Sequence, residues 1–329
     1  MSGSSIFKSA GFILAILFLS IVSGLRVGSG YDFYNYEYYY NTISSSPFRY
    51  DIEPLYYLIC KISPTFYTSN FILSLLTNSI LFMACSKLRL SRIVFLLSFV
   101  FSEVYLSQFN IARQSLAFSF LALYACFLCN ARGRMGVLVS SVMAISSHYM
   151  SILFLAPSIF LSRFKINILL MAVVLILFYL LSRLGAFISL FEFLVSFLPS
   201  KYSYYADENL REMSGGGGKF ILEGIVFILC AYLLKNNKER ITIFTINIVF
   251  LGLVISFIAI EIPILFRLAY LFLFFKVFLF SILLGGNGIQ NKSNRIIVFM
   301  VFLIYIMSTF AMNISVNVYG ILPYSNYLF

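Results

Sequence analysis

The chain has 329 residues, of which 61% are hydrophobic and only 11% are charged. A soluble globular protein of this composition would lack the polar surface that water requires, so that class is excluded. The formal net charge of +11 comes mostly from Lys and Arg in short segments between apolar runs. This placement is typical of residues that orient membrane helices, so no nucleic-acid partner is expected.

Apolar runs follow one another along the chain, each close to the ~20 residues that cross the hydrocarbon core as a helix. They predict an all-α polytopic integral membrane protein with about 10–11 transmembrane helices in a single transmembrane domain, residues 1–329. The first run lacks a small-residue cleavage site and is expected to be an uncleaved helix. The expected spans lie near residues 6–25, 68–86, 93–106, 114–130, 167–184 and 220–234, in a run ending near 261, at 264–284, and in a run ending near 313.

Positive charge between the spans predicts which breaks face the cytoplasm. The two termini are then expected on opposite sides of the membrane. Residues 26–67, which are acidic and rich in Tyr, and residues 185–219, which begin as an amphipathic stretch, become periplasmic loops. The breaks expected in the cytoplasm are Lys87–Arg92, Arg132–Arg134, Lys235–Arg240 and Lys292–Arg295.

Residues 135–162 form an apolar stretch with a polar break at Ser146–His148. Two half-length helices that meet at this break would keep the following Arg163 and Lys165 in the cytoplasm. Irregular backbone at membrane depth is tolerated where protein or water covers it, so we favour the broken form. The alternative is one full span, with the short apolar run 186–198 restoring the topology.

Ionisable residues at or within the ends of the spans are the candidates for function, because an ionised side chain at mid-membrane costs roughly 2.5–3.5 kcal/mol. Each also has a structural alternative. Arg26 and Lys201 can snorkel at the interface, Asp32 can be a turn residue, and Glu53 can cap the helix that begins at Pro54. His148, the single histidine, can be a hydrogen-bonded packing residue, and Arg113 and Arg267 can pair with Glu53, Glu103 or Glu261.

Several guanidinium groups, carboxylates and one imidazole are thus expected at one membrane face. Guanidinium groups match phosphate oxygens in charge and geometry, and a carboxylate or imidazole can accept a proton from a sugar hydroxyl. Tyrosine rings, of which the chain has 23, offer faces and hydroxyls that suit sugars. The pattern favours a site for a lipid-linked phosphosugar, and it indicates no metal or cofactor site.

The order of several short motifs resembles the EpsG-like branch of the Wzy-type polysaccharide polymerases. The match extends from residue 26 to residue 324, although each motif is only a few residues long. The stronger pieces are Arg26-Val-Gly28, Tyr31-Asp32-Phe-Tyr34-Asn-Tyr36, Glu53-Pro54-Leu-Tyr56, Ile111-Ala-Arg113-Gln114-Ser-Leu-Ala117 and His148-Tyr149. The weaker pieces are Lys201-Tyr202 with Tyr205, Arg267, and Pro323-Tyr324.

This resemblance implies a GT-C-like glycosyltransferase in the bacterial inner membrane, with its active site facing the periplasm. Such proteins polymerise undecaprenyl-pyrophosphate-linked repeat units into O-antigen (lipopolysaccharide) or exopolysaccharide without a cofactor. A chain-length regulator and a flippase would be its protein partners, beside membrane lipid. The alternatives are a lipid-linked oligosaccharide flippase, an O-antigen ligase-like transferase and a membrane O-acyltransferase.

The expected roles follow from the chemistry of pyrophosphate departure. Asp32, His148 and Glu53 are the candidates for the catalytic base, with Asp32 and His148 ranked before Glu53. The remaining candidates would bind substrate, and the arginines among them would hold the phosphates. These substrate-binding candidates are Arg26, Arg113, Gln114, Arg267, Tyr31, Tyr149, Lys201 and Tyr324.

Overall fold

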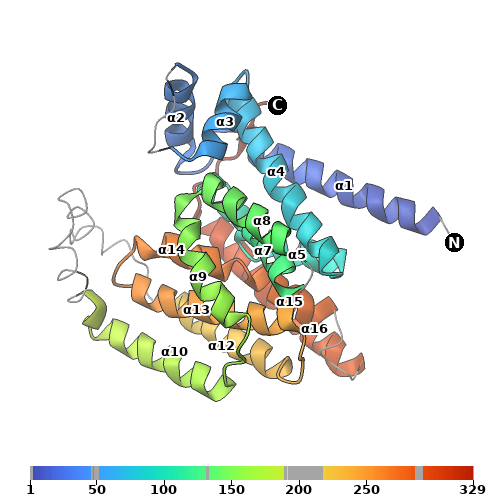
Figure 1. Ribbon diagram of the computed structural model, residues 1–329, viewed down its shortest axis with the longest axis vertical. Coiled ribbons are helices and arrows are strands. Elements are labelled where there is room, and N and C mark those ends of the chain that lie inside the picture. The colour runs from blue at the N-terminus through green and yellow to red at the C-terminus, as the bar shows by residue number, and fades with distance from the viewer. Residues whose placement is uncertain are drawn as a thin grey trace. The chain divides into compact units, whose positions relative to one another are not determined.

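The computed structural model is a helical protein (Figure 1). Among the residues that it describes, two short strands form one small sheet. It describes residues 3–45, 47, 52–130, 133–188, 191, 218–285 and 292–328, with the backbone alone for 3–9 and 292–295. The chain divides into two compact units, residues 1–155 with 280–329 (unit 1) and residues 156–279 (unit 2). The prediction of a single transmembrane domain and its two periplasmic loops stays a prediction.

Unit 1 is built from helices around α4, which packs against both α1 and α7, while α8 packs against α7 and α3. The short strands β1 (Arg26–Val27) and β2 (Ser325–Asn326) pair antiparallel. The helices of this unit are α1 (Gly3–Gly24), α2 (Phe33–Ser45), α3 (Pro54–Ile62), α4 (Phe66–Lys87), α5 (Arg92–Phe101), α6 (Val104–Ser107), α7 (Ala112–Cys129), α8 (Arg134–Ser147), the 3-10 helix η1 (Tyr149–Ser151) and α16 (Lys292–Ser315).

Polar side chains join α1 to α4 inside unit 1. The amide of Asn78 donates to the Ser20 hydroxyl at 3.0 Å, and Gln108 donates to Asn78 at 3.2 Å. Ser23 and Ser74 share a further short hydrogen bond. Hydrogen bonds between helices of this kind hold membrane helices together, because lipid offers the same side chains no partner.

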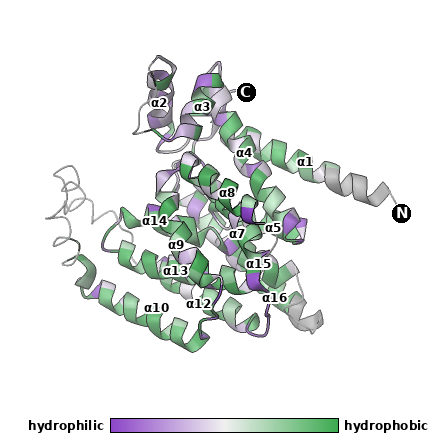
Figure 2. Cartoon of the chain, viewed as in Figure 1, coloured by the Kyte–Doolittle hydropathy of each residue, from purple (hydrophilic) through white to green (hydrophobic). Residues whose placement is uncertain are grey.

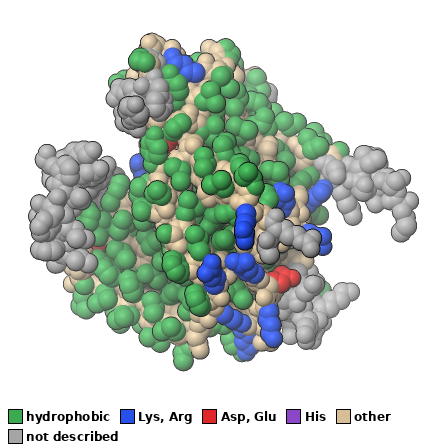
Figure 3. All heavy atoms as spheres, in the orientation of Figure 1, with side chains coloured by type: hydrophobic (Ala, Val, Ile, Leu, Met, Phe, Trp, Pro, Cys, Tyr) green, Lys and Arg blue, Asp and Glu red, His purple; other side chains and the backbone are tan. Residues whose placement is uncertain are grey.

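Unit 2 contains α10 (Ile168–Arg183), α12 (Gly218–Leu233), α13 (Arg240–Ala259) and α14 (Leu265–Leu273). The helices α9 (Ile152–Leu161) and α15 (Lys276–Gly285) each continue from one unit into the other along the chain. The side chains over α10 are almost all hydrophobic, as contact with lipid requires (Figures 2 and 3). A buried ion pair lies within this unit, with Lys276 Nζ 3.1 Å from Glu223 Oε1.

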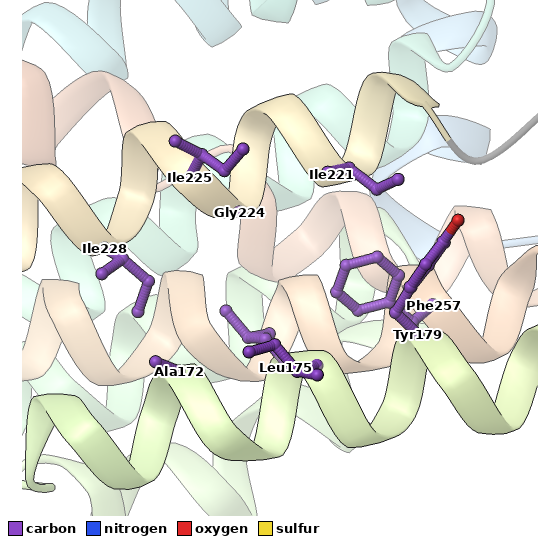
Figure 4. A pocket seen from close by; sticks show the side chains of 9 residues that line it. Ala172, Leu175, Tyr179, Ile221, Gly224, Ile225, Ile228 and Phe257 are labelled. Atoms are coloured by element: carbon purple, nitrogen blue, oxygen red, sulfur yellow. The ribbon is translucent and has the colours of Figure 1, made fainter.

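An apolar groove of about 260 Å³ lies on unit 2, between α10 and α12 with α13 behind them (Figure 4). Leu175 and Ile225 face into it from the two outer helices. At one end the ring of Tyr179 meets Phe257 edge-on, with ring centres 5.8 Å apart. Such a lining suits hydrocarbon, which agrees with a helical unit surrounded by lipid.

Five helices among the described residues are long and apolar enough to cross a membrane. They are Phe66–Lys87, Ala112–Cys129, Arg240–Ala259, Leu265–Gly285 and Ile296–Ser315. Shorter apolar helices include α5, α8 and α10. The chain is therefore an all-α, multi-pass membrane protein. The total of 10–11 spans, the GT-C-like arrangement and the periplasmic segments stay predictions.

Two features of the sequence-based prediction can be compared directly with the fold. The break at His148 is confirmed, because α8 ends at Ser147 and the chain resumes as η1 and α9. The expected loop 26–67, in contrast, contains the helices α2 and α3. Most of the second expected loop, residues 185–219, lies outside the described residues.

Candidate active site

Glu53 is the centre of a polar cluster in unit 1. It immediately precedes α3, whose first residue is Pro54, a residue well suited to the start of a helix. Its side chain makes no capping hydrogen bond, so the capping alternative is wrong for the carboxylate. Instead the carboxylate, only 6% exposed, bridges two groups: Oε1 lies 2.8 Å from His148 Nδ1 and Oε2 lies 2.6 Å from Arg113 Nη1.

His148 stands where the polar break interrupts the apolar stretch. Its backbone N–H still bonds to the Ala144 carbonyl, so the residue closes α8 while its side chain is turned toward Glu53. The next residue, Tyr149, donates its hydroxyl to the Ile52 carbonyl at 3.2 Å and ties η1 to the residue before Glu53. A carboxylate on Nδ1 orients the ring and leaves Nε2 as the atom that can exchange a proton with a substrate.

Arg113 lies in the first turn of α7, and three tyrosine rings surround its guanidinium. The guanidinium carbon is 5.6 Å from the ring centre of Tyr36, 5.3 Å from Tyr39 and 5.2 Å from Tyr56. The Tyr36 hydroxyl also accepts the backbone N–H of Arg113 at 3.3 Å. The ion-pair alternative for Arg113 is therefore confirmed with Glu53 as partner. Aromatic faces stabilise a cation that has little water around it.

The electrostatics of the cluster keep its carboxylate ionised. Burial raises the pKa of Glu53, but the hydrogen bond from His148 and the positive charge of Arg113 outweigh it, so that the net pKa lies below the ordinary value of 4.5. Glu53 therefore carries a full negative charge at neutral pH. The side chains of His148 and Arg113 are 20% and 23% exposed, so both reach the surface from a buried anion.

Arg26 belongs to a different arrangement. Its side chain is buried, and its guanidinium donates to the carbonyls of Ser29 at 3.0 Å, Phe109 at 3.2 Å and Ser23. Burial lowers its pKa to about 10, although nearby tyrosines such as Tyr36 raise it, so it stays charged at neutral pH. The snorkelling alternative is wrong, because the head group points inward. These bonds give Arg26 a structural role in the turn between α1 and α2.

Tyr31 and Tyr324 help to join this turn to the end of the chain. The Tyr31 hydroxyl donates to the Asn317 carbonyl at 3.0 Å, and that of Tyr324 donates to the Val22 carbonyl at 2.9 Å. Gly30 also requires its lack of a side chain here, because a Cβ would lie 2.2 Å from the Phe109 carbonyl oxygen. These two tyrosines thus lie with Arg26 around the two-stranded sheet.

The other predicted site residues are more dispersed. Asp32 occupies the turn before α2, where Asn35 donates to its carboxylate at 3.2 Å. Gln114 is buried next to Arg113 on α7. Arg267 is an exposed residue of α14 in unit 2, and Lys201 lies outside the described residues. Within the described residues, no three His, Cys, Asp or Glu side chains are grouped as metal ligands.

Sequence reasoning did not single out Tyr39 and Tyr56 as parts of the site. With 23 tyrosines in the chain, their residue type alone carried little information. A usable signal was their spacing, because Tyr36 and Tyr39 are one helical turn apart and Tyr56 follows Glu53 by three residues. Such spacings place these rings beside a common neighbour once α2 and α3 are recognised as helices.

The fold and the polar cluster define a multi-pass membrane protein with a buried carboxylate that orients an imidazole and a guanidinium. The chain belongs to the EpsG family, whose model matches residues 10–326, nearly the whole length. No curated protein and no solved structure matches it significantly. Membership of the family suggests a polysaccharide polymerase-like role.

Proposed function

We propose that the protein is a membrane glycosyltransferase that polymerises undecaprenyl-pyrophosphate-linked oligosaccharide repeat units into O-antigen or exopolysaccharide. The observation that carries this proposal is the bridge from Glu53 to His148 and Arg113. An imidazole oriented by a buried carboxylate is suited to general-base catalysis. Membership of the EpsG family, which suggests a polysaccharide polymerase-like role, supports the proposed reaction class.

In the proposed reaction, an acceptor sugar hydroxyl attacks the anomeric carbon of the donor glycan. The new C–O bond forms as the bond from the anomeric carbon to pyrophosphate breaks, and the pyrophosphate leaves with the electron pair. The proton of the hydroxyl passes to His148 Nε2. The imidazolium that results is stabilised by Glu53, which already holds Nδ1 at 2.8 Å. Glu53 acts as a positioning residue, because both its oxygens are engaged.

Arg113 has two tasks in this proposal. It keeps Glu53 ionised through their 2.6 Å contact, and the exposed part of its side chain offers positive charge to the leaving pyrophosphate. Arg267 and Lys201 remain proposed phosphate-binding residues. Asp32 remains an alternative base, and Gln114 and Tyr149 are proposed to shape the site around Arg113 and His148.

The proposed setting is the periplasmic face of the bacterial inner membrane, within a GT-C-type fold. A flippase and a chain-length regulator would act with the protein there. A ligase-like transferase would break the same pyrophosphate bond but use a different acceptor. The product therefore distinguishes the two functions: a ladder of repeat units comes from a polymerase, and one transfer to an unrelated acceptor comes from a ligase.

The test is a reconstitution of the full-length protein in nanodiscs with lipid-linked repeat units purified from its host. The wild type should convert them into a ladder of longer glycans, and His148→Ala should make none above background. The matched control is Tyr232→Ala, an exposed residue of unit 2, which should leave the ladder unchanged. An intact ladder from folded His148→Ala protein would remove His148 from the mechanism, and no ladder from the wild type would refute the polymerase.

A further inference from the structure

Helix α2 presents one face to the site and the opposite face to the surroundings. Its buried positions, Phe33, Tyr36, Tyr40 and Ile43, recur at helical spacing and pack inward. Its outer face is also tyrosine-rich: Tyr34 and Tyr38 are 67% and 68% exposed. They stand one helical turn apart, which places the two rings side by side on one surface. Each ring touches one neighbouring ring, Phe33 for Tyr34 and Tyr39 for Tyr38, and keeps about two thirds of its surface open.

One of the outer tyrosines, Tyr38, is connected to the catalytic cluster through Tyr39. The rings of Tyr38 and Tyr39 meet edge-on with centres 6.1 Å apart. Tyr39 is itself 37% exposed and lies 5.3 Å from the Arg113 guanidinium, which pairs with Glu53. A molecule lying along this face would thus lead directly to the residues of the proposed reaction.

The polar residues on the outer face of α2 indicate which class of ligand it would bind. Asn35 and Asn41 are exposed between the tyrosines, and Asp32 and Glu37 are half-buried. Residues 31–45 contain no Lys or Arg. Amide and carboxylate groups exchange hydrogen bonds with hydroxyls, while tyrosine rings offer flat apolar contact at little entropic cost. A neutral, hydroxyl-rich chain fits this set, and a phosphate does not.

Tyrosines also gather at the membrane interface, so the outer face of α2 has a second possible environment. An interfacial helix normally carries Leu, Phe or Trp on one face and Lys or Arg on the other. The outer face of α2 exposes none of these residue types, and its acidic residues would be repelled by anionic head groups. Figure 2 shows the contrast between this polar helix and α10, which is hydrophobic over most of its length. The observations therefore favour a water-facing surface.

We infer that Tyr34, Tyr38 and Tyr39 form a platform on which the sugar chain of the substrate lies, so that its reactive hydroxyl reaches His148. This inference rests on the proposed function and deepens it, because it assigns the recognition of the sugar chain to α2. The flat faces of the sugar rings stack on Tyr34 and Tyr38. The platform raises affinity for the glycan and takes no part in proton transfer.

The decisive variant pair is Tyr34→Ala with Tyr38→Ala, set against Tyr34→Phe with Tyr38→Phe. With full-length protein in nanodiscs and the host's lipid-linked repeat unit, the Ala pair should raise KM about 25-fold, since each of the two aromatic contacts contributes about fivefold and the factors multiply. Its kcat should stay within about threefold of the wild type, because the platform takes no part in proton transfer. The Phe pair keeps both rings and should behave as the wild type. An unchanged KM in the Ala pair, or an equal loss in the Phe pair, would overturn stacking on these rings.

A direct measurement of oligosaccharide binding tests the platform independently of whether the protein is a polymerase. The oligosaccharide released from the repeat unit is titrated against wild type and the Ala pair by calorimetry, with Tyr232→Ala as control. Binding lost only in the Ala pair supports the platform even if no ladder forms. A ladder abolished by His148→Ala, together with equal oligosaccharide binding in all variants, overturns the platform and leaves the polymerase standing.

The membrane alternative has its own readout. A fluorescent label on Tyr38→Cys, in full-length protein in nanodiscs of phosphatidylethanolamine and phosphatidylglycerol, should stay bright when nitroxide-labelled lipid is added. The same label on Leu177→Cys of the hydrophobic α10 should be quenched. Equal quenching at both positions would place α2 in the lipid interface and refute the platform.

Discussion

Two carboxylates that pair with a cationic side chain, Glu53 in unit 1 and Glu223 in unit 2, differ in how far solvent reaches their partners. Glu53 in unit 1 pairs with His148 and Arg113, each about one fifth exposed. Glu223 in unit 2 pairs with Lys276, and these two side chains are only 11% and 10% exposed. An ion pair whose two side chains are both shielded from solvent stabilises the fold or specifies how its helices pack. A buried anion that holds two accessible groups prepares them for a ligand.

The exposure of the partner group distinguishes a functional carboxylate from a structural one, whereas residue type alone does not. Any ionisable residue at membrane depth suggests a functional site, and both carboxylates satisfy that description. The exposure of the partner group is the better criterion, because chemistry needs an atom that substrate can approach. On this criterion Glu53 is the candidate for a functional site, and Glu223 is the candidate for a role in the packing of α12.

The largest effect is expected when the two carboxylates are neutralised separately. Glu53→Gln removes the charge that orients His148, so turnover should fall by about 10² to 10⁴, the usual contribution of a positioned base. Glu223→Gln should leave turnover per folded molecule within a few-fold of the wild type. Glycan formation normalised to monodisperse protein measures both. A comparable loss of turnover in Glu53→Gln and Glu223→Gln would show that partner exposure does not identify the functional carboxylate.

Stability should show the opposite ranking. Lys276→Met leaves Glu223 buried without its cation, which typically costs about 3–5 kcal/mol. Combining Lys276→Met with Glu223→Gln should recover most of that loss, because no uncompensated charge remains. Thermal unfolding in a fixed detergent measures the series. A double variant no more stable than Lys276→Met would show that the pair is not the source of the cost.

A smaller effect is expected from changing the geometry of the cation while keeping its charge. Arg113→Lys retains the pairing with Glu53 but loses the planar group that contacts three tyrosine rings. Turnover should fall by about 10- to 100-fold, as for a lost hydrogen bond to a charged group. Expression and melting temperature should change little. Normal ladders from Arg113→Lys would assign Arg113 to packing alone.

The smallest expected effect is on the stability of the protein at acidic pH. The pKa of Glu53 is lower in the folded protein than its ordinary value of 4.5, so Glu53 contributes stability above that value and loses it as pH falls through the lowered one. The wild type should therefore stay folded at pH 4.5 and weaken below it. Glu53→Gln should show a flatter decline in melting temperature, and Tyr232→Ala should follow the wild type. Identical acid profiles for Glu53→Gln and wild type would contradict this linkage.

The apolar helices could be predicted from sequence because their signal is local. The expected span 68–86 corresponds to α4 at Phe66–Lys87, and the polar break at His148 ends α8 as expected. Helix α2 was not predicted, because two of its four buried positions, Tyr36 and Tyr40, are tyrosines, which do not register as an apolar stripe. A helix whose inward face is aromatic and hydroxylated resembles a loop in composition.

Residues of the candidate site could be named from the sequence, but the contacts between them could not be predicted. Glu53 lies 60 residues from Arg113 and 95 from His148, so only the tertiary fold brings them together. Their ranking also changed: the sequence placed Asp32 ahead of Glu53, whereas Glu53 is the residue that binds both partners. Arg26 turned inward because it donates to the nearby carbonyls of Ser23 and Ser29 and to the distant carbonyl of Phe109, and no local sequence pattern predicts this last contact.

The pairing of β1 with β2 has a consequence for how the protein is made. Arg26 aligns with Asn326, so β1 can acquire its strand partner only after the residues between the two strands have been synthesised. All the helices described here precede β2 in the chain. A nascent chain therefore holds the turn between β1 and Asp32 without this support until those helices have been made. The order of synthesis would delay completion of the turn until the helices have entered the membrane.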